Sequence, residues 1–312
     1  MQKFLKKTLL FLFPLVVLSF VLDGVLSSKL KKTTTLFKGE YAVWNDIFEG
    51  KIDSDILIIG SSRAWVHFNP TMITEQTGIS CYNIGIDGHP FLLQNTRYDI
   101  LRKYNKKPKT VIVSLESNSF FKRPDLYNSS QFLPYLRTNK DDLKEPLLKF
   151  KGFNKYDFVL PLIRYYGNFS VLKEVLLSSS NSTNRVKGFE AHAKKWNSDL
   201  LNAKKKYKSL KVKIDTTTLN LFKEFVKKNK AEEIEVILVY SPEYIEGQEF
   251  ISNRDSIINL YKKISDENKI SFIDFSNDSM SYKKEYFYNA THLNKKGANL
   301  FTQKLIDTLN NK

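Results

Sequence analysis

Hydrophobic positions in this chain follow two alternating patterns. Near-continuous apolar runs of strand length occur at residues 55–59, 80–84, 110–115, 234–240 and 270–274. Longer segments that suit a helix separate them, at residues 69–77, 90–104, 218–229, 257–267 and 295–309. Apolar strands that alternate with helices are typical of a parallel sheet covered on both faces. We therefore expect a doubly wound, flavodoxin-like α/β/α fold of about five strands.

The alternation lapses between about residues 119 and 213. This stretch has aromatic-rich segments, a serine-asparagine run and a lysine-rich segment with a helical pattern, at residues 132–135, 156–169, 178–184 and 190–208. We expect a mainly helical insertion here. The apolar segment 156–177 could lie on a membrane surface, but packing against the sheet is the interpretation that we favour.

The N-terminus carries the longest apolar run, from Leu9 to Leu22, with lysines on both flanks. We expect residues 8–26 to cross a lipid bilayer, at the short end of the length that spans a hydrocarbon core. No clear small-x-small site follows the run, which counts against a cleaved signal peptide, and the basic flanks count against a buried helix. The predicted organisation is an anchor at 1–32 and an α/β domain at 33–312.

The sequence gives less information about which end of the anchor lies in the cytoplasm. Three lysines precede the apolar run and three follow it, so the positive-inside rule favours neither side. The shortness of the preceding tail favours an N-terminus inside and a C-terminal domain outside the cytoplasm, either periplasmic or on the outer face.

Composition narrows the possible partners. The formal net charge is +16, which suits nucleic acid, an anionic membrane or an anionic polymer as a neighbour. The lysines are spread along the chain and no nucleic-acid motif accompanies them, so we expect a solvated basic surface and no nucleic-acid partner. Cys81 is the only cysteine and the four histidines lack metal-site spacing. We therefore expect no disulfide, no metal and no cofactor.

Candidate chemistry follows the predicted strands. Ser62 comes after the first strand in Gly60-Ser61-Ser62, Gly88 after the second, and Asn118 after the third. His292 lies beyond the fifth strand, in Asn289-Ala290-Thr291-His292. In an open parallel sheet, ligands bind at the carboxyl ends of the strands. A serine hydroxyl becomes a good nucleophile when an imidazole takes its proton.

These four short blocks, in this order, resemble those of the SGNH (GDSL-like) hydrolase family. The resemblance implies that Ser62 is the nucleophile and His292 the general base. It also implies that the oxyanion is held by the backbone N–H groups of Ser62 and Gly88 and by the Asn118 side chain. With the anchor, the layout is similar to membrane-tethered bacterial members that move acyl groups on cell-envelope polymers.

Two residues depart from the family pattern. Asn289 stands where the family has the aspartate that orients the histidine, and Glu116 replaces the glycine of the third block. An amide oxygen accepts the same hydrogen bond as a carboxylate but adds no charge. The site is then a slow serine-histidine dyad, a dyad rescued by another carboxylate, or inactive. Candidate rescuers are Glu116 first, and then Asp278 and Glu285.

Neighbouring residues leave further alternatives. Arg63 could bind an anionic group of the substrate or form a structural salt bridge. We expect Asp87 and His89, which flank the site in sequence, to lie on the loop surface.

The leading functional hypothesis is an extracytoplasmic ester hydrolase or O-acyltransferase that uses Ser62, His292 and Asn289. Its expected partners are an acylated glycan or envelope polymer, the lipid bilayer and a membrane acyl-transfer protein. One alternative is a weakened or inactive SGNH-like protein that binds a polysaccharide or an assembly partner. Another is a flavodoxin-like protein that binds a small anion or nucleotide, although the chain has no glycine-rich phosphate loop.

Overall fold

The chain forms two compact units in the computed structural model, which describes residues 1–33, 39–177 and 185–311. One unit comprises Met1–Asn45 and Pro124–Thr183, and the other comprises Asp46–Arg123 and Asn184–Lys312. We call them the anchor unit and the sheet unit. The predicted boundary at residue 33 thus differs from this division, which also splits the predicted insertion. The serine-asparagine run at 178–184 lies outside the described residues.

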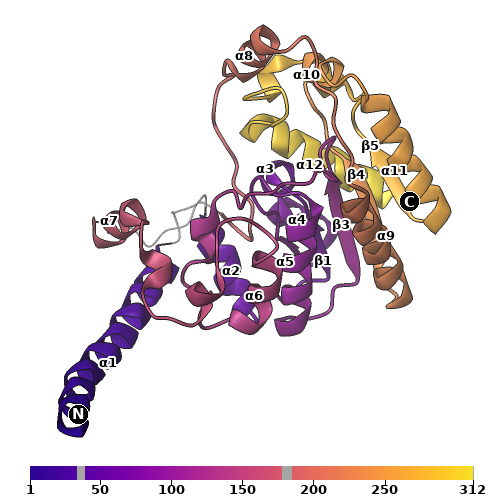
Figure 1. Ribbon diagram of the computed structural model, residues 1–312. Coiled ribbons are helices and arrows are strands. Elements are labelled where there is room, and N and C mark those ends of the chain that lie inside the picture. Colours follow the sequence, from indigo (N-terminus) through magenta and orange to yellow (C-terminus); the bar gives the residue numbers. More distant parts are fainter. Residues whose placement is uncertain (34–38, 178–184, 312) are drawn as a thin grey trace. The chain divides into compact units, whose positions relative to one another are not determined.

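The sheet unit is built on a five-stranded parallel sheet in the order β2-β1-β3-β4-β5 (Figure 1). On β1, Ile58 lies opposite Asn83 of β2 and Ile112 of β3. This is the flavodoxin-like strand order, so the predicted fold class is confirmed. The strands are β1 (Ile56–Ile59), β2 (Cys81–Asn83), β3 (Thr110–Leu115), β4 (Glu235–Tyr240) and β5 (Ser271–Asp274).

Two groups of helices cover the sheet. The first group is α3 (Ser62–His67), α4 (Pro70–Thr77) and α12 (Lys295–Asn310). The second group is α5 (Phe91–Tyr104), α9 (Thr216–Ala231) and α11 (Arg254–Asn268). Local sequence sets several of their ends. Asn69, for example, caps α4 by accepting hydrogen bonds from the N–H groups of Thr71 and Met72, and Pro70 occupies the first helical position.

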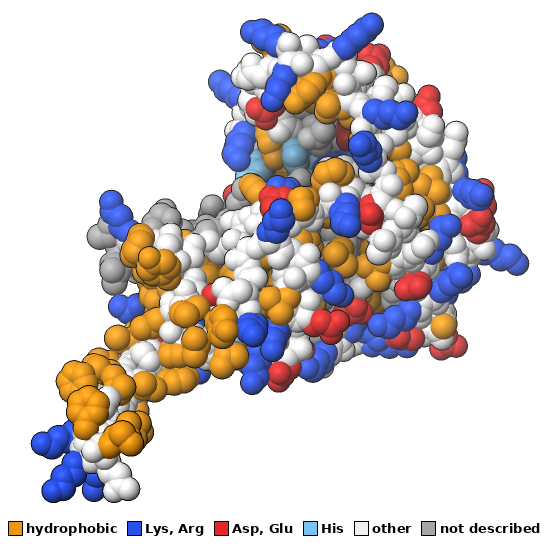
Figure 2. All heavy atoms as spheres, viewed as in Figure 1, with side chains coloured by type: hydrophobic (Ala, Val, Ile, Leu, Met, Phe, Trp, Pro, Cys, Tyr) orange, Lys and Arg blue, Asp and Glu red, His pale blue; other side chains and the backbone are white. Residues whose placement is uncertain are grey.

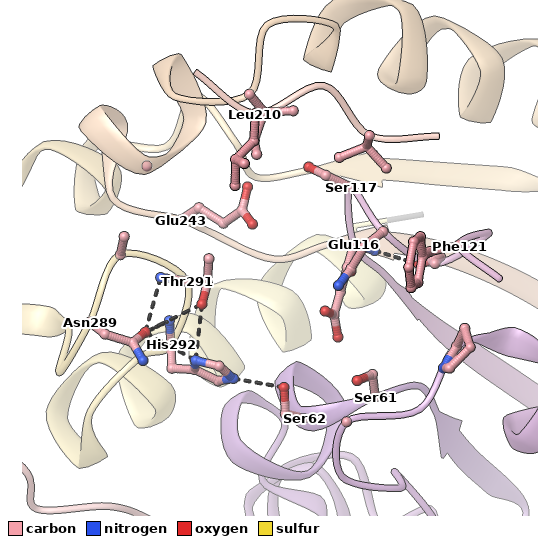
Figure 3. A pocket seen from close by; sticks show the side chains of 18 of the residues that line it. Ser61, Ser62, Glu116, Ser117, Phe121, Leu210, Glu243, Asn289, Thr291 and His292 are labelled. Atoms are coloured by element: carbon pink, nitrogen blue, oxygen red, sulfur yellow. Dashed lines mark hydrogen bonds between the residues drawn. The ribbon is translucent and has the colours of Figure 1, made fainter. Parts of the chain in front are cut away.

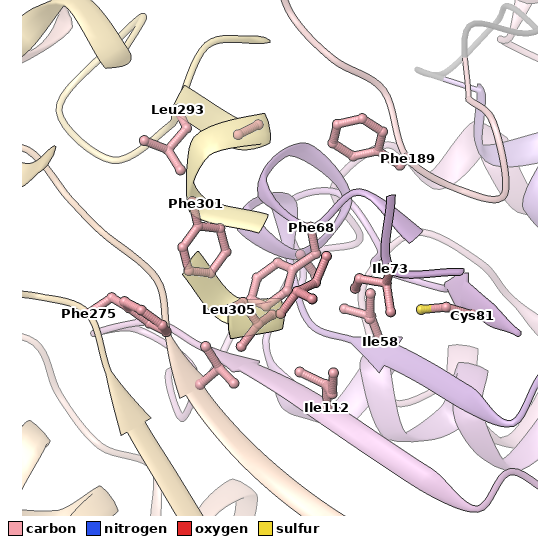
Figure 4. Packing of buried hydrophobic residues seen from close by; sticks show 14 of the residues in the cluster. Ile58, Phe68, Ile73, Cys81, Ile112, Phe189, Phe275, Leu293, Phe301 and Leu305 are labelled. Carbon is pink, nitrogen blue, oxygen red and sulfur yellow. The ribbon is translucent and has the colours of Figure 1, made fainter. Parts of the chain in front are cut away.

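Apolar side chains from strands and helices meet in the core beneath the first group of helices (Figure 4). Ile58 and Ile112 from the sheet pack with Phe68, Phe301 and Leu305. Cys81 joins the same cluster and is fully buried, which raises the pKa of its thiol. Burial in an apolar core makes a thiol inert, as expected for a small core residue.

Residues 185–215 cross the sheet unit as a largely extended strap. The predicted helix at 190–208 is wrong over 190–198, and only α8 (Asp199–Lys206) is helical. Backbone groups of the extended part bond to other segments, from Glu190 to Trp65 and from Asn197 to Tyr288. A helix would need these same backbone groups for its own hydrogen bonds, so tertiary bonding overrides the local pattern.

The anchor unit contains α1 (Gln2–Lys32), the long apolar helix that Figure 2 shows covered with hydrophobic side chains. This helix is long and apolar enough to cross a membrane. It continues through Asp23 and Gly24, and Asp23, Ser27 and Leu30 are buried in the unit. The other elements of this unit are short: α6 (Lys140–Leu147), α7 (Phe169–Leu177) and 3₁₀ turns at Ser129–Phe132, Lys155–Phe158 and Ile163–Tyr165.

Two short elements remain. The helix α2 (Glu40–Phe48) contains the buried Trp44, and the division between the two units falls within its residues. The sheet unit also contains α10 (Ile245–Glu249) and two 3₁₀ turns, Ser279–Tyr282 and Lys284–Tyr286.

Candidate active site

Ser62 is presented by a tight turn between β1 and α3. Gly60 has φ +153°, and a Cβ at this position would lie 2.7 Å from the Cβ of Ala64 and 2.8 Å from that of Ser114. Only glycine suits both the conformation and the space, so the turn depends on it. The chain then enters α3 at Ser62, whose Oγ lies 2.7 Å from Nε2 of His292 (Figure 3). This distance allows direct proton transfer from the hydroxyl to the imidazole.

Asn289 meets the other nitrogen of the histidine. Its Oδ1 lies 3.0 Å from Nδ1 of His292 and also accepts hydrogen bonds from the backbone N–H groups of Thr291 (3.1 Å) and His292 (2.8 Å). Backbone N–H groups only donate, so they identify the oxygen as the amide atom that faces the ring. Nδ1 therefore carries the hydrogen, and Nε2 presents its lone pair to the Ser62 hydroxyl.

The tautomer of His292 differs from that of the catalytic histidine in a serine protease whose aspartate was changed to asparagine. In that case the substitution cost about 10⁴ in turnover because the histidine took the wrong tautomer. Here the two backbone donors fix the amide, so the correct tautomer is kept. Asn289 supplies no negative charge to stabilise His292 if this imidazole takes up a proton.

Two residues that the sequence analysis missed hold the histidine in place. The ring of Tyr288 stacks on His292, with centroids 5.3 Å apart and planes 11° apart. His67 is buried, and its Nε2 accepts the backbone N–H of Leu293 at 3.0 Å while its Nδ1 lies 2.8 Å from Oγ of Ser241. Burial, helped by Arg63, holds the pKa of His67 well below its usual value. A neutral His67 is what the acceptor role requires.

A cavity of about 500 Å³ opens at this site, within the sheet unit. Ser62, Gly88, Asn118 and His292 all line it, so the four residues predicted from separate blocks come together. Gly88 has φ +70°, a backbone conformation that favours glycine. In the described part of the chain, no group of His, Cys, Asp or Glu residues is arranged to hold a metal ion. Much of the remaining wall is apolar: Phe121, Leu200, Ala203, Leu210, Val212, Phe250 and Ile251.

Arg63 does not reach the cavity as a substrate-binding group, and that alternative is wrong. Its side chain is 1% exposed and pairs with Glu243, whose Oε1 lies 2.6 Å from Nη1. Arg63 also donates to Ser241, so its role is structural. The expectation for Asp87 and His89 is also wrong, since both are buried rather than on the loop surface.

Glu116 lies on the serine side of the site, with its carboxylate directed toward Ser61 and Ser62 (Figure 3). Burial raises its pKa to about 7, although the positive charge of Arg63 opposes the shift. The Ser61 hydroxyl and the Arg63 backbone N–H donate to this carboxylate. Its Oε1 has no hydrogen-bond partner among the described residues.

No candidate rescuer is placed to replace the missing aspartate. Nδ1 of His292 faces Asn289 and the Thr291 hydroxyl, the latter at 3.0 Å, whereas Glu116 lies beyond the serine (Figure 3). The other two candidates pair with lysines instead. Asp278 lies 2.8 Å from Lys304, and Glu285 lies 3.1 Å from Lys296.

Comparison with known proteins gives only distant likenesses. No protein-family model matches the chain, and no curated protein matches it either. Among similar solved structures, one described as a lipolytic protein of the G-D-S-L family from Desulfitobacterium hafniense is 13% identical with a TM-score of 0.40, over 82% of this chain and 99% of that chain. A GDSL-like lipase from Bacteroides thetaiotaomicron is also 13% identical, with a TM-score of 0.37, over 88% of this chain and 98% of that chain. Both descriptions name the family that the sequence blocks resemble.

Proposed function

We propose that this chain is a serine-dependent ester hydrolase or O-acyltransferase, tethered to a membrane by α1, that acts outside the cytoplasm on an acylated glycan or other envelope polymer. The observation that carries this proposal is the relay from Ser62 through His292 to Asn289. Its two contacts, 2.7 Å and 3.0 Å, have the geometry and the tautomer that nucleophilic acyl transfer needs.

The first half of the reaction forms an acyl-enzyme. Ser62 Oγ attacks the carbonyl carbon of the ester, and its proton moves to Nε2 of His292. The carbonyl oxygen becomes an oxyanion, held by the N–H groups of Ser62 and Gly88 and by the Asn118 amide. When the intermediate collapses, the bond to the alcohol oxygen breaks and His292 returns the proton to that oxygen.

The second half frees the serine. Water or a sugar hydroxyl attacks the acyl carbon and gives its proton to Nε2, and the bond between Ser62 Oγ and the acyl carbon breaks as the proton returns to Oγ. Water as the second nucleophile makes the protein a hydrolase, and a sugar hydroxyl makes it a transferase. The apolar wall, which includes Leu200, Leu210 and Phe250, suits the acyl group better than it suits a glycan.

Retention of α1 as an anchor is supported by its buried end. The Asp23 carboxylate lies 2.7 Å from the Arg164 guanidinium, and both residues are buried. Cleavage beyond Asp23 would remove this partner and leave the buried Arg164 without its carboxylate, which is strongly destabilising. A disposable signal peptide would not be built into the unit in this way.

The test combines a fluorophosphonate probe, which labels activated serines, with hydrolysis of p-nitrophenyl acetate. Ser62→Ala should lose labelling and at least about 10³-fold of turnover, because the nucleophile is removed. Ser256→Ala, an exposed serine on α11, is the matched control and should behave as the unmodified protein. Unchanged labelling in Ser62→Ala would remove Ser62 from the mechanism. An unmodified protein that is neither labelled nor active would instead favour the binding-only alternative.

A further inference from the structure

The anchor unit exposes large apolar side chains along one short stretch of chain. Tyr166 is 85% exposed and Phe169 is 69% exposed, far more than side chains of this size usually are. Four further large apolar residues of the stretch are also exposed, by 41–55%. We call the six the apolar collar: Tyr156, Val159, Leu160, Ile163, Tyr166 and Phe169.

Residues 162–165, within the stretch that carries the collar, contact Asp23 and Ser27 of α1. The Asp23 carboxylate accepts the backbone N–H of Leu162 at 2.8 Å and pairs with Arg164 at 2.7 Å. One helical turn further along α1, Ser27 Oγ lies 2.7 Å from the Tyr165 hydroxyl. Leu162 has φ +63°, a strained conformation for leucine that the bond to Asp23 helps to hold. The collar is thus fixed beside the end of the apolar run.

The length of the exposed part of α1 determines the depth of Asp23 in a bilayer. Side chains from Phe4 to Leu22 are exposed or half-buried, and the first fully buried one is Asp23. At 1.5 Å per residue the uncharged part of this run, Thr8 to Leu22, measures about 22 Å, and Lys6 and Lys7 before it can extend their ammonium groups to the headgroups on the far side of a hydrocarbon core of roughly 30 Å. If the run fills the core, Asp23 and the bonded stretch lie at the boundary between lipid tails and headgroups.

We propose that the apolar collar inserts into the interfacial layer of the same bilayer that α1 spans. This inference rests on the membrane tether of the proposed function. Tyrosine and phenylalanine are suited to this layer, where an apolar ring meets lipid and a polar edge meets water. Figure 2 shows hydrophobic side chains along α1 and where this helix joins the rest of the anchor unit.

Charged neighbours fit the same position. The Lys155 ammonium lies 5.2 Å from the centre of the Tyr156 ring, and the Arg137 guanidinium lies 5.2 Å from that of Phe20. Long cationic side chains at the edge of an apolar surface reach toward lipid phosphates. Continuity with a helix that faces lipid favours a bilayer over a protein as the occupant of the collar.

The experiment uses the full chain in vesicles of phosphatidylcholine and phosphatidylglycerol. Single cysteines at Val159→Cys and Tyr166→Cys carry an environment-sensitive NBD dye, and buried Cys81 stays unlabelled. Two matched sites are labelled separately. Glu145→Cys is an exposed position of the same unit outside the collar, and Leu15→Cys reports on α1.

Spin-labelled lipids then report depth. If the collar lies about 5–10 Å into the interface, a spin label near the headgroup should quench the NBD fluorescence at Val159→Cys and Tyr166→Cys about two-fold or more. The fluorescence at Glu145→Cys should not be quenched. Leu15→Cys should be quenched best by a label deep in the acyl chains. Quenching at Leu15→Cys but not at the collar would overturn this proposal and leave the tether intact. No quenching at Leu15→Cys or at the collar positions would overturn both the collar proposal and the membrane tether. Equal quenching at Glu145→Cys and at the collar positions would overturn the proposal that the collar in particular enters the bilayer.

Discussion

Asn289→Asp tests whether the active site lacks only a charge. The Asn289 oxygen already accepts hydrogen bonds from two backbone N–H groups and lies 3.0 Å from Nδ1 of His292. A carboxylate has nearly the same shape as the amide and accepts the same bonds, so the substitution should leave the loop unchanged. The difference is one negative charge beside the imidazolium that forms as Ser62 attacks.

The size of the gain follows from this geometry. Two opposite unit charges about 4 Å apart attract by about 4 kcal/mol at an effective dielectric constant of 20. Only part of the proton charge has developed in the transition state, and the site is partly open to solvent, which reduces the gain. A gain of about 1.4 kcal/mol already gives a ten-fold rate, so we expect turnover to rise about ten-fold or more.

The assay is hydrolysis of p-nitrophenyl acetate by matched preparations near pH 8, where imidazole is neutral in its ordinary state. Asn289→Ala is the opposite control, and it should fall below the unmodified protein because Nδ1 loses its acceptor. Equal turnover in Asn289→Asp and the unmodified protein would refute the argument that charge is the missing element. If Glu116→Gln were then the damaging change, the charge would come from Glu116 after all.

Four further predictions concern stability and location. The raised pKa of Glu116 means that the folded state keeps a proton that the unfolded state releases, so this residue should lower stability progressively from about pH 4.5 to 7. Urea unfolding of Glu116→Gln should therefore show a gain that grows to as much as about 3 kcal/mol above pH 7, and a constant difference would contradict it. Arg63→Met should destabilise by about 3–5 kcal/mol, because Glu243 is left buried without its cation, and a neutral result in the same titration would show that Glu243 finds another partner. Gly60→Ala should lower both the melting temperature and the turnover, since its Cβ would lie 2.7 Å from that of Ala64, and normal values of both would refute the tight-turn argument. The full chain should stay with membranes after a high-salt wash, which strips proteins held by charge alone, and its body should be open to protease from outside. Release by salt would contradict the anchor.

The sheet could be predicted because its strands are buried on both faces. Strand β3, at Thr110–Leu115, has the predicted limits, and the other four strands differ by a residue or two at their ends. A parallel strand covered on both sides needs an almost continuous apolar run, and such runs are visible in a single sequence. The helix error at 190–198 arose where backbone bonds to distant segments replaced local ones.

The site was predicted in part for a similar reason. Ser62, Gly88, Asn118 and His292 belong to short blocks placed around the predicted strands, and the topology brings them to one cavity. The roles of Arg63, His67 and Tyr288 depend on contacts across the fold. His67, for instance, supports a loop 226 positions away along the chain. No local pattern marks such a residue, since a buried histidine and an exposed one look alike in sequence.

The discontinuous anchor unit also has a consequence for how the chain is made. Asp23 and Arg164 are 141 positions apart, and the segment of the sheet unit that contains three strands is synthesised between them. At about 5–20 residues per second, Asp23 waits roughly 7–28 s for its partner to leave the ribosome. During this interval Asp23, nine residues before the end of α1, lacks its buried partner Arg164. Completion of the first unit to be started is therefore delayed until the first segment of the second unit, Asp46–Arg123, has been made.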